Sequence, residues 1–314
     1  MKNGKLLAIA ITALAATQSA QAAPVWGDGL NQVFFQNVEN LYRETAECTV
    51  NTCLAYDAAN DPTGYQRVNP LVANNVQVGD IFAGIINTQN IMNDGSDIWL
   101  QGLNDRFTGY FAHEVTSIVP EGGIGHITLG VASADPFGIL QAGEQFRLYV
   151  SPGLTYETNG SVFDDITKAT SGTFWGSLGL GSEGYTYSHS DLTQPVDQSG
   201  TIFFMGLNFI TKGAAYNAGL LALVNDPQNE QEVGGTTANL VCSAADIANP
   251  NVMCTDMFGV ARIDLNNLWG QGSSPWTISS NDPWSIYRVP EPSSMALLGI
   301  GLAGLGLARR RRTA

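Results

Sequence analysis

The feature that most constrains the fold of this chain is a succession of short β-branched and aromatic runs separated by turns rich in Gly, Asn and Asp. Residues 145–150 alternate polar and apolar side chains, as a strand with one buried face requires. Turn sequences such as 60–64 and 93–97 end the runs. We therefore predict a mainly β, β-sandwich-like fold with few short helices. Strands are expected at 81–86, 115–119, 126–131, 145–150, 173–180, 185–188, 201–207 and 261–265, and short helices at 105–112 and 243–249.

Residues 33–42 allow two interpretations. Leu30, Phe34, Val38 and Leu41 fall on one helical face, whereas the β-branched and aromatic residue types of the run suit a strand. The sequence alone does not choose between a helix and a strand here.

Two apolar segments bound the chain. The first follows Lys2 and Lys5, runs from Leu6 to Ala16, and ends in Ser19-Ala20-Gln21-Ala22. A positive start, a short apolar stretch and an A-x-A site define a secretory signal peptide at 1–22, cut after Ala22 by signal peptidase after passage through the Sec machinery. We expect a β-rich exported ectodomain at 23–270, followed by residues 271–288 as either a linker or a last strand.

The second apolar segment lies in the tail 289–314. Pro290 and Pro292 hold Glu291 in a stiff, extended segment. An uncharged helix at 293–308 would rise about 24 Å, a short transmembrane span whose flanking arginines can snorkel. Four arginines end the tail and are expected to stay cytoplasmic: Arg309, Arg310, Arg311 and Arg312.

The order Pro-Glu-Pro, Leu/Gly/Ala helix and arginine cluster resembles the PEP-CTERM sorting signal of Gram-negative bacteria. The resemblance implies recognition and cleavage near Pro290–Pro292 by an exosortase, a membrane-embedded cysteine transpeptidase-like enzyme. It also implies transient anchoring in the inner membrane, followed by transfer to the cell surface or the extracellular matrix. The alternative is a plain C-terminal anchor that is never cut.

The exported part is strongly acidic. The net charge of the chain is −14 at pH 7, and the six basic residues of the two end segments lie outside the ectodomain, which is therefore more negative still. Such a surface repels nucleic acid and anionic lipid, so nucleic acid is excluded as a partner. The same charge favours solubility and attracts divalent cations.

All four cysteines lie in the exported part: Cys48, Cys53, Cys242 and Cys254. Because the periplasm and the outside are oxidising, we expect disulfides. Four cysteines allow three connectivities, and local pairing of 48 with 53 and of 242 with 254 requires the least chain reorganisation. Each local bridge would contribute about 2–3 kcal/mol. A zinc site is the alternative, although the spacings differ from the C-x2-C pairs of zinc modules.

Motifs of catalysis are missing from the sequence. It contains no G-x-S-x-G, P-loop or H-E-x-x-H, and the three histidines, His113, His126 and His189, are far apart in the chain. A β fold could bring the three histidines together as a metal site. Histidines on strands and loops more often have no role in metal binding, which is the alternative. The acidic pairs Asp164-Asp165 and Glu230/Glu232 are read as solvated loop residues. We therefore predict no enzyme and no cofactor, with Ca²⁺ as the one exception considered.

Two sets of residues are candidate ligand contacts. Asp94 and Asp97 offer oxygen atoms around a turn glycine, as hard cations prefer, and a plain hairpin turn is the alternative. Trp276 and Trp284 have polar neighbours, so we expect them to be the most exposed tryptophans, able to stack on sugars. Core packing is the alternative for these and the other aromatic residues Trp175, Tyr185, Tyr187 and Trp269.

The sequence thus predicts a non-enzymatic protein sorted to the surface or matrix, associated with exopolysaccharide in a biofilm. A carbohydrate-binding or adhesive module is one alternative, which exposed tryptophans would favour. A secreted hydrolase is the other, which a deep pocket with paired acids would favour.

Overall fold

The computed structural model describes residues 24–102, 105–121, 124–152, 160–180, 185–189, 202–213, 231–233, 236–239, 252–254, 256–263 and 274–288. The expected signal peptide 1–22, the transmembrane helix 293–308 and the helix at 243–249 lie outside these residues. Within them, no helix is long and apolar enough to cross a membrane.

The described chain is mainly β, as predicted, with one short 3-10 helix η1 (Thr45–Glu47) and an α-helix α2 (Val162–Thr170). The strands are β1 (Gly29–Glu44), β2 (Tyr65–Arg67), β3 (Ile81–Asn93), β4 (Ser96–Leu100), β5 (Asp105–Glu121), β6 (Ile124–Val131), β7 (Phe146–Pro152), β8 (Thr173–Gly179), β9 (Tyr185–His189), β10 (Ile202–Lys212), β11 (Gln231–Val233), β12 (Thr236–Asn239), β13 (Val252–Cys254), β14 (Met257–Ile263) and β15 (Ile278–Arg288). The predicted helix at 105–112 was wrong, because these residues lie in β5.

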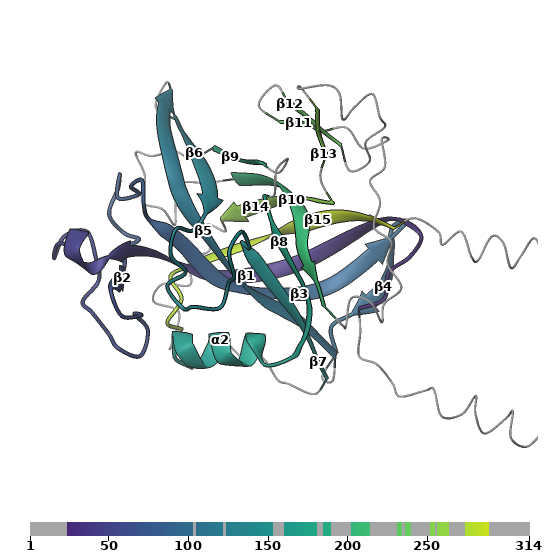
Figure 1. The fold of residues 1–314 in the computed structure, drawn as a ribbon, viewed down its shortest axis with the longest axis horizontal. Helices are drawn as coiled ribbons and strands as arrows, with labels where there is room; N and C mark the ends of the chain where they lie inside the picture. The colour runs from purple at the N-terminus through teal and green to yellow at the C-terminus, as the bar shows by residue number, and fades with distance from the viewer. Residues whose placement is uncertain are drawn as a thin grey trace, which may run out of the picture.

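One sheet closes on itself (Figure 1). β1 pairs with β15 along one edge and with β3 along the other, and β5, β7, β8, β10 and β14 complete the circuit from β3 back to β15. All of these pairings are antiparallel. The expected sandwich of two facing sheets is thus corrected to a closed ring, because the long curved strand β1 joins the two ends of the sheet. A separate small sheet contains β11, β12 and β13.

The ring has an apolar interior to which all eight strands contribute. On β1, Val33, Phe35 and Leu41 belong to this inner cluster, whereas Val38 and Tyr42 belong to a second cluster on the outer face. Side chains alternate between the two faces of a strand, so both faces of β1 are buried. This double burial explains why the run 33–42 showed no simple strand alternation.

Helix α2 covers the outer face (Figure 1). Ser161 caps its N-terminus by accepting a hydrogen bond from the Asp164 backbone N–H, and the acidic first turn suits the positive end of the helix dipole. Val162, Ile166 and Ala169 pack towards the sheet. The Thr108 hydroxyl of β5 also donates to the Ala169 carbonyl, at 2.7 Å, which fixes the helix against the ring.

The last strand corrects the expectation for the two tryptophans. Residues 278–288 form β15, so this part of 271–288 is a strand and no linker. Trp276 is 0% exposed and Trp284 is 2% exposed, because one enters the outer cluster and the other the inner one. Gly259 of β14 leaves the space for Trp284, since a Cβ at that glycine would lie 2.0 Å from the indole Cδ1. Neither indole is available to stack on a sugar in this structure.

Candidate functional site

The point where the chain leaves the ring is the first candidate site. β15 ends at Arg288, which lies opposite Gly29 at the start of β1. The Pro290–Pro292 segment begins two residues later, so Pro290 lies at most about 7 Å along the chain from Arg288. A processing enzyme would therefore work directly beside the β1–β15 edge.

The segment that leads into β1 is fastened at the same end of the ring. The Asn31 side chain accepts a hydrogen bond from the Gly27 N–H at 2.8 Å and donates to the Gly27 carbonyl at 2.9 Å. Asn93 of β3 donates to the Asp28 carbonyl at 3.0 Å. The first and last parts of the ring, at 27–31 and up to Arg288, thus lie on neighbouring strands.

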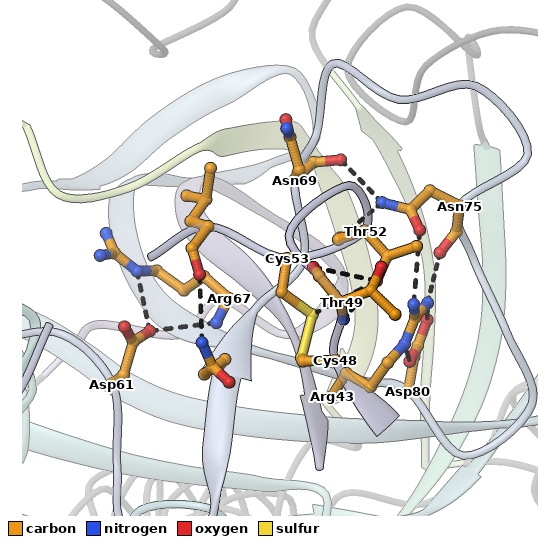
Figure 2. The surroundings of a disulfide bond; sticks show 12 residues. Arg43, Cys48, Thr49, Thr52, Cys53, Asp61, Arg67, Asn69, Asn75 and Asp80 are labelled. Atoms are coloured by element: carbon orange, nitrogen blue, oxygen red, sulfur yellow. Dashed lines mark hydrogen bonds and ion pairs between the residues drawn. A yellow bond between two sulfur atoms is a disulfide. The ribbon is translucent and has the colours of Figure 1, made fainter. Parts of the chain in front are cut away.

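The second candidate site is the segment 45–80 between β1 and β3, which we call the stapled loop (Figure 2). A disulfide joins Cys48 to Cys53, confirming one of the two local pairings that the sequence favoured. Thr49 and Thr52 tighten the short loop that it closes, because the Thr49 N–H donates to the Thr52 hydroxyl at 3.0 Å. Cys242 lies outside the described residues, and the pairing of Cys254 with it stays a prediction.

A buried ion pair holds one end of the stapled loop. Arg43 donates to both carboxylate oxygens of Asp80, at 2.7 and 2.8 Å, and both side chains are 1% exposed (Figure 2). Burial raises the pKa of Asp80, and the hydrogen bonds and charge of Arg43 act against this rise. Asn75 links the pair to the disulfide, since its amide donates to the Thr52 carbonyl at 2.8 Å.

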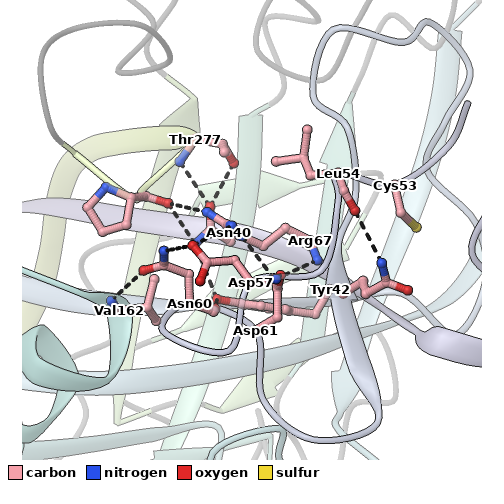
Figure 3. Close-up of polar contacts among 12 residues, drawn as sticks. Asn40, Tyr42, Cys53, Leu54, Asp57, Asn60, Asp61, Arg67, Val162 and Thr277 are labelled. Atoms are coloured by element: carbon pink, nitrogen blue, oxygen red, sulfur yellow. Dashed lines mark hydrogen bonds and ion pairs between the residues drawn. The ribbon is translucent and has the colours of Figure 1, made fainter. Parts of the chain in front are cut away.

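A second network ties the stapled loop to the lead-in of β15 (Figure 3). Arg67 donates from Nε to Asp61 at 2.9 Å and from Nη1 to the Pro275 carbonyl at 3.1 Å. The Asn40 side-chain oxygen accepts from the backbone N–H and the hydroxyl of Thr277, at 2.9 and 2.8 Å. The stapled loop is therefore tied to the ring at several points, and we call its outer surface the platform.

The surface of the platform carries apolar groups. A recess of about 330 Å³ lies beside the disulfide and is lined by residues of 48–55 and by Gln66. Val50 at the loop tip is 95% exposed. Tyr56, Leu71 and Val78 are further exposed apolar residues of the same segment. Rigid loops with exposed apolar groups are typical of contact surfaces.

The third candidate site is a polar cluster inside the ring. Asn37 and Glu39 of β1, His113 of β5 and Ser280 of β15 line one small cavity among phenylalanine side chains. Burial raises the pKa of Glu39 to about 7, and a hydrogen bond from Ser280 opposes the rise. Burial lowers the pKa of His113 to about 3, so this imidazole is neutral at physiological pH.

The histidines that the sequence offered as metal ligands are not brought together in the described residues. His113 pairs with Val131 and His126 with Val119, so the two histidines lie six residues apart along the β5–β6 ladder, about 20 Å. His189 ends β9. In the part of the chain that the structure describes, no cluster of three His, Cys, Asp or Glu residues could hold a metal ion.

The acidic candidate residues lie in a hairpin turn and in helix α2, where most of them have structural hydrogen bonds. Asp94 and Gly95 both have positive φ, 48° and 77°, as in a type I′ hairpin turn between β3 and β4. Asp97 accepts a hydrogen bond from Asn90 at 2.6 Å. Asp165, expected on a solvated loop, lies in α2, is 0% exposed, and accepts from the Trp276 indole N–H at 2.9 Å. Ca²⁺ binding at Asp94 and Asp97 stays a prediction.

Sequence reasoning missed the interior cluster. The signal was present in β1, where Val33, Phe35, Asn37, Glu39 and Leu41 alternate with the rest of the run. Two polar side chains in the middle of an inward-facing apolar series indicate a buried polar site. The ambiguity between helix and strand hid this series.

Comparison with known proteins identifies the tail. Residues 288–312 match the family model of the PEP-CTERM protein-sorting motif. The match contains Pro290, Glu291, Pro292 and the four arginines 309–312, and it begins at the residue where β15 ends. The chain therefore carries a PEP-CTERM sorting motif, which implies export, processing by an exosortase and sorting to the cell surface. No curated protein and no solved structure matches the chain.

Proposed function

We propose that the protein is a non-enzymatic component of the cell surface or extracellular matrix that associates with exopolysaccharide after its tail has been cut. The observation that carries the proposal is the sorting motif at residues 288–312, directly after the last strand of an exported β domain. In this proposal the tail helix holds the chain in the inner membrane, and an exosortase cuts near Pro290–Pro292.

The chemistry of the described domain supports a role as a binding surface. Its interior is filled with side chains, with a cavity of about 20 Å³ that is too small for a sugar. The stapled loop instead offers a rigid platform with the exposed side chain of Val50. In this proposal, exopolysaccharide contacts the outer surface of the domain.

The sorting step is tested by the intact mass and the location of the C-terminus, with the chain produced in cells with and without an exosortase. We expect loss of the residues beyond Pro290–Pro292 only when the enzyme is present. Glu291→Gln should slow or abolish this cut, whereas Glu47→Gln on the exposed η1 helix should be cut as the parent is. An uncut chain in the inner membrane of both backgrounds would overturn the sorting role.

The association with exopolysaccharide needs a separate test. The cut protein should sediment with purified exopolysaccharide of the producing cells. Substitution of Val50→Asp on the platform should reduce the bound fraction, and Leu100→Asp, at an exposed position of β4, should not. Equal binding of all three proteins would remove the platform as the contact surface. Absence of binding by the parent would overturn the matrix role and leave sorting untouched.

A further inference from the structure

A small cavity lies within the closed sheet, on the inner side of the β1–β15 seam. Its volume is about 20 Å³, and its polar lining consists of Asn37, Glu39, His113 and Ser280. A cavity of this size holds about one water molecule and excludes any organic ligand. The remaining lining is aromatic and aliphatic, with Phe82 of β3 and Phe146 of β7 among it.

Several polar atoms of this lining are enclosed without a partner. They are Asn37 Oδ1, Glu39 Oε1 and His113 Nε2. Asn37 is 3% exposed, Glu39 4% and His113 2%. Buried polar atoms in native proteins are almost always hydrogen-bonded, either to protein or to ordered water. Three such atoms around one cavity therefore point to a ligand.

Hydrogen-bond chemistry shows which ligand fits. Gln145 Nε2 lies 3.0 Å from His113 Nδ1, and because an amide nitrogen is a donor, Nδ1 accepts and the ring proton is assigned to Nε2. The cavity then presents one N–H donor from His113 and the oxygen acceptors of Asn37 and Glu39. A water molecule can accept a hydrogen bond from the His113 N–H and donate one each to the Asn37 and Glu39 oxygens. Two ionisable ligands, Glu39 and His113, are a poor set for a metal ion, which prefers three or more.

We infer that this cavity is a binding site for a single water molecule held by Glu39, His113 and Asn37, and that the occupied site fastens the last strand β15 to β1 from inside the ring. The connection to β15 is Ser280, which lies opposite Asn37 in the β1–β15 register and accepts a hydrogen bond from Asn37 Nδ2 at 3.3 Å. The inference concerns the ring and is independent of the proposed matrix role.

The site makes this seam sensitive to pH. Glu39, whose pKa burial raises to about 7, is protonated below that pH and charged above it. His113, whose pKa burial lowers to about 3, is the other ionisable group in the described lining; β3, β6, β7 and β10 contribute apolar side chains. Because His113 is neutral at this pH, ionisation of Glu39 places a buried charge without an opposite charge in the described lining, and the seam should open more readily above about pH 7.

The water itself is tested by a high-resolution crystal structure of the full chain after signal-peptide removal. We expect one isolated density peak within hydrogen-bond distance of Glu39 Oε1, His113 Nε2 and Asn37 Oδ1. A dry cavity, or one closed by a neighbouring side chain, would overturn the inference.

The fastening role is tested by hydrogen exchange of the same full chain in detergent, expressed as protection factors to remove the intrinsic effect of pH. Between about pH 6 and pH 8 the protection of β15 amides should fall about tenfold in the parent, because a folded pKa of about 7 replaces an unfolded one of 4.5. Protection of β8 amides, away from the seam, should fall less.

Two variants separate the site from a general loss of stability. Glu39→Gln keeps the shape and the hydrogen bonding but cannot ionise, so its β15 protection should be independent of pH over this range. Glu44→Gln, at the exposed end of the same strand, should behave as the parent. The same pH-dependent loss in Glu39→Gln, or an equal loss in β8 and β15, would contradict the inference.

Discussion

At the scale of single residues, two buried arginines of the described domain each pair with a buried aspartate. Arg43 and Asp80 are the clearest case, since both are 1% exposed and form a two-point contact. An ion pair of this kind contributes little net stability, but removal of one partner leaves the other buried and unpaired. The pair therefore fixes the end of the stapled loop more than it strengthens the fold.

Arg43→Ala should lower the free energy of unfolding by about 3–5 kcal/mol, because Asp80 would remain buried without its partner. The measurement is equilibrium denaturation followed by tryptophan fluorescence. Arg262→Ala, at an exposed position of β14, is the matched control and should change the value by less than about 0.5 kcal/mol. Equal losses for the two variants would show that Asp80 finds other compensation.

The lowered pKa of His113 leads to a prediction about how the stability of the fold changes in acid. Burial lowers the pKa of His113 in the folded state to about 3, from the ordinary value of 6.5, so its contribution to stability is fully present above about pH 6.5 and is lost as the pH falls towards 3. The loss amounts to about 5 kcal/mol at most. Glu39 acts in the opposite sense, since its contribution is present below about pH 4.5 and lost as the pH rises to about 7.

His113→Gln should therefore move the midpoint of acid unfolding to lower pH, even if the variant is less stable at neutral pH. His126→Gln, at a partly exposed position of β6, serves as the control and should leave the midpoint in place. Tryptophan fluorescence during an acid titration measures both. An unchanged midpoint in His113→Gln would mean that this imidazole can be protonated within the fold.

At the scale of elements, the stapled loop depends on several ties that differ in strength. The disulfide closes a loop of only a few residues, whereas the two arginine networks connect segments far apart in the chain. Short loops gain little from a crosslink, since few unfolded conformations are removed. The arginine networks should therefore carry most of the order of this segment.

Replacement of both Cys48 and Cys53 by Ser should lower the free energy of unfolding by about 2 kcal/mol, equivalent to about 4–8 °C in melting temperature. The variant leaves Cys242 and Cys254 untouched, which a reducing agent would not. Differential scanning calorimetry gives the shift, and circular dichroism should show an unchanged sheet. Loss of the sheet would indicate that the disulfide is needed for folding of the whole ring.

The elements also show how far sequence reasoning reached. The alternating run 145–150 falls on β7 apart from its first residue, and the turn 93–97 joins β3 to β4, because local spacing and turn chemistry decide such features. The helix α2 was missed, although Ser161 and Asp164 form its cap, because nine residues give few periods to recognise. The closed ring was missed because it depends on pairing β1 with β15, which no local pattern encodes.

The candidate sites also differ in how far they could be predicted from the sequence. The sorting motif was recognisable from the sequence because its residues are contiguous. The interior cluster was not, because Glu39, His113 and Ser280 meet only after three distant strands have joined the ring. Trp284 was misjudged because its polar neighbours in sequence point to the other face of β15, and Trp276, which precedes β15, because its polar neighbour Thr277 is itself buried.

At the scale of the whole molecule, the closing strand of the fold is also the strand that leads into the sorting tail. β15 lies between β14 and β1, so the ring closes only when the last described residues have joined the first. The exported chain must therefore be nearly complete before it folds. From then on, the sorting tripeptide begins two residues beyond the end of β15, and we expect the folded domain to restrict the approach of an enzyme.

This closeness leads to a prediction about processing. Six Gly and Ser residues inserted after Arg288 would allow the tripeptide to move up to about 20 Å further from the ring. The exosortase should then cut the tail faster, as measured by pulse–chase analysis of the uncut and cut forms. The same six residues inserted between Ala73 and Asn74 of the stapled loop should leave the rate unchanged, because this loop follows the end of β1 opposite to Gly29, the residue that pairs with Arg288. A slower cut after the first insertion would mean that the enzyme recognises the end of β15 together with the motif, and the folded domain would then be part of the sorting signal.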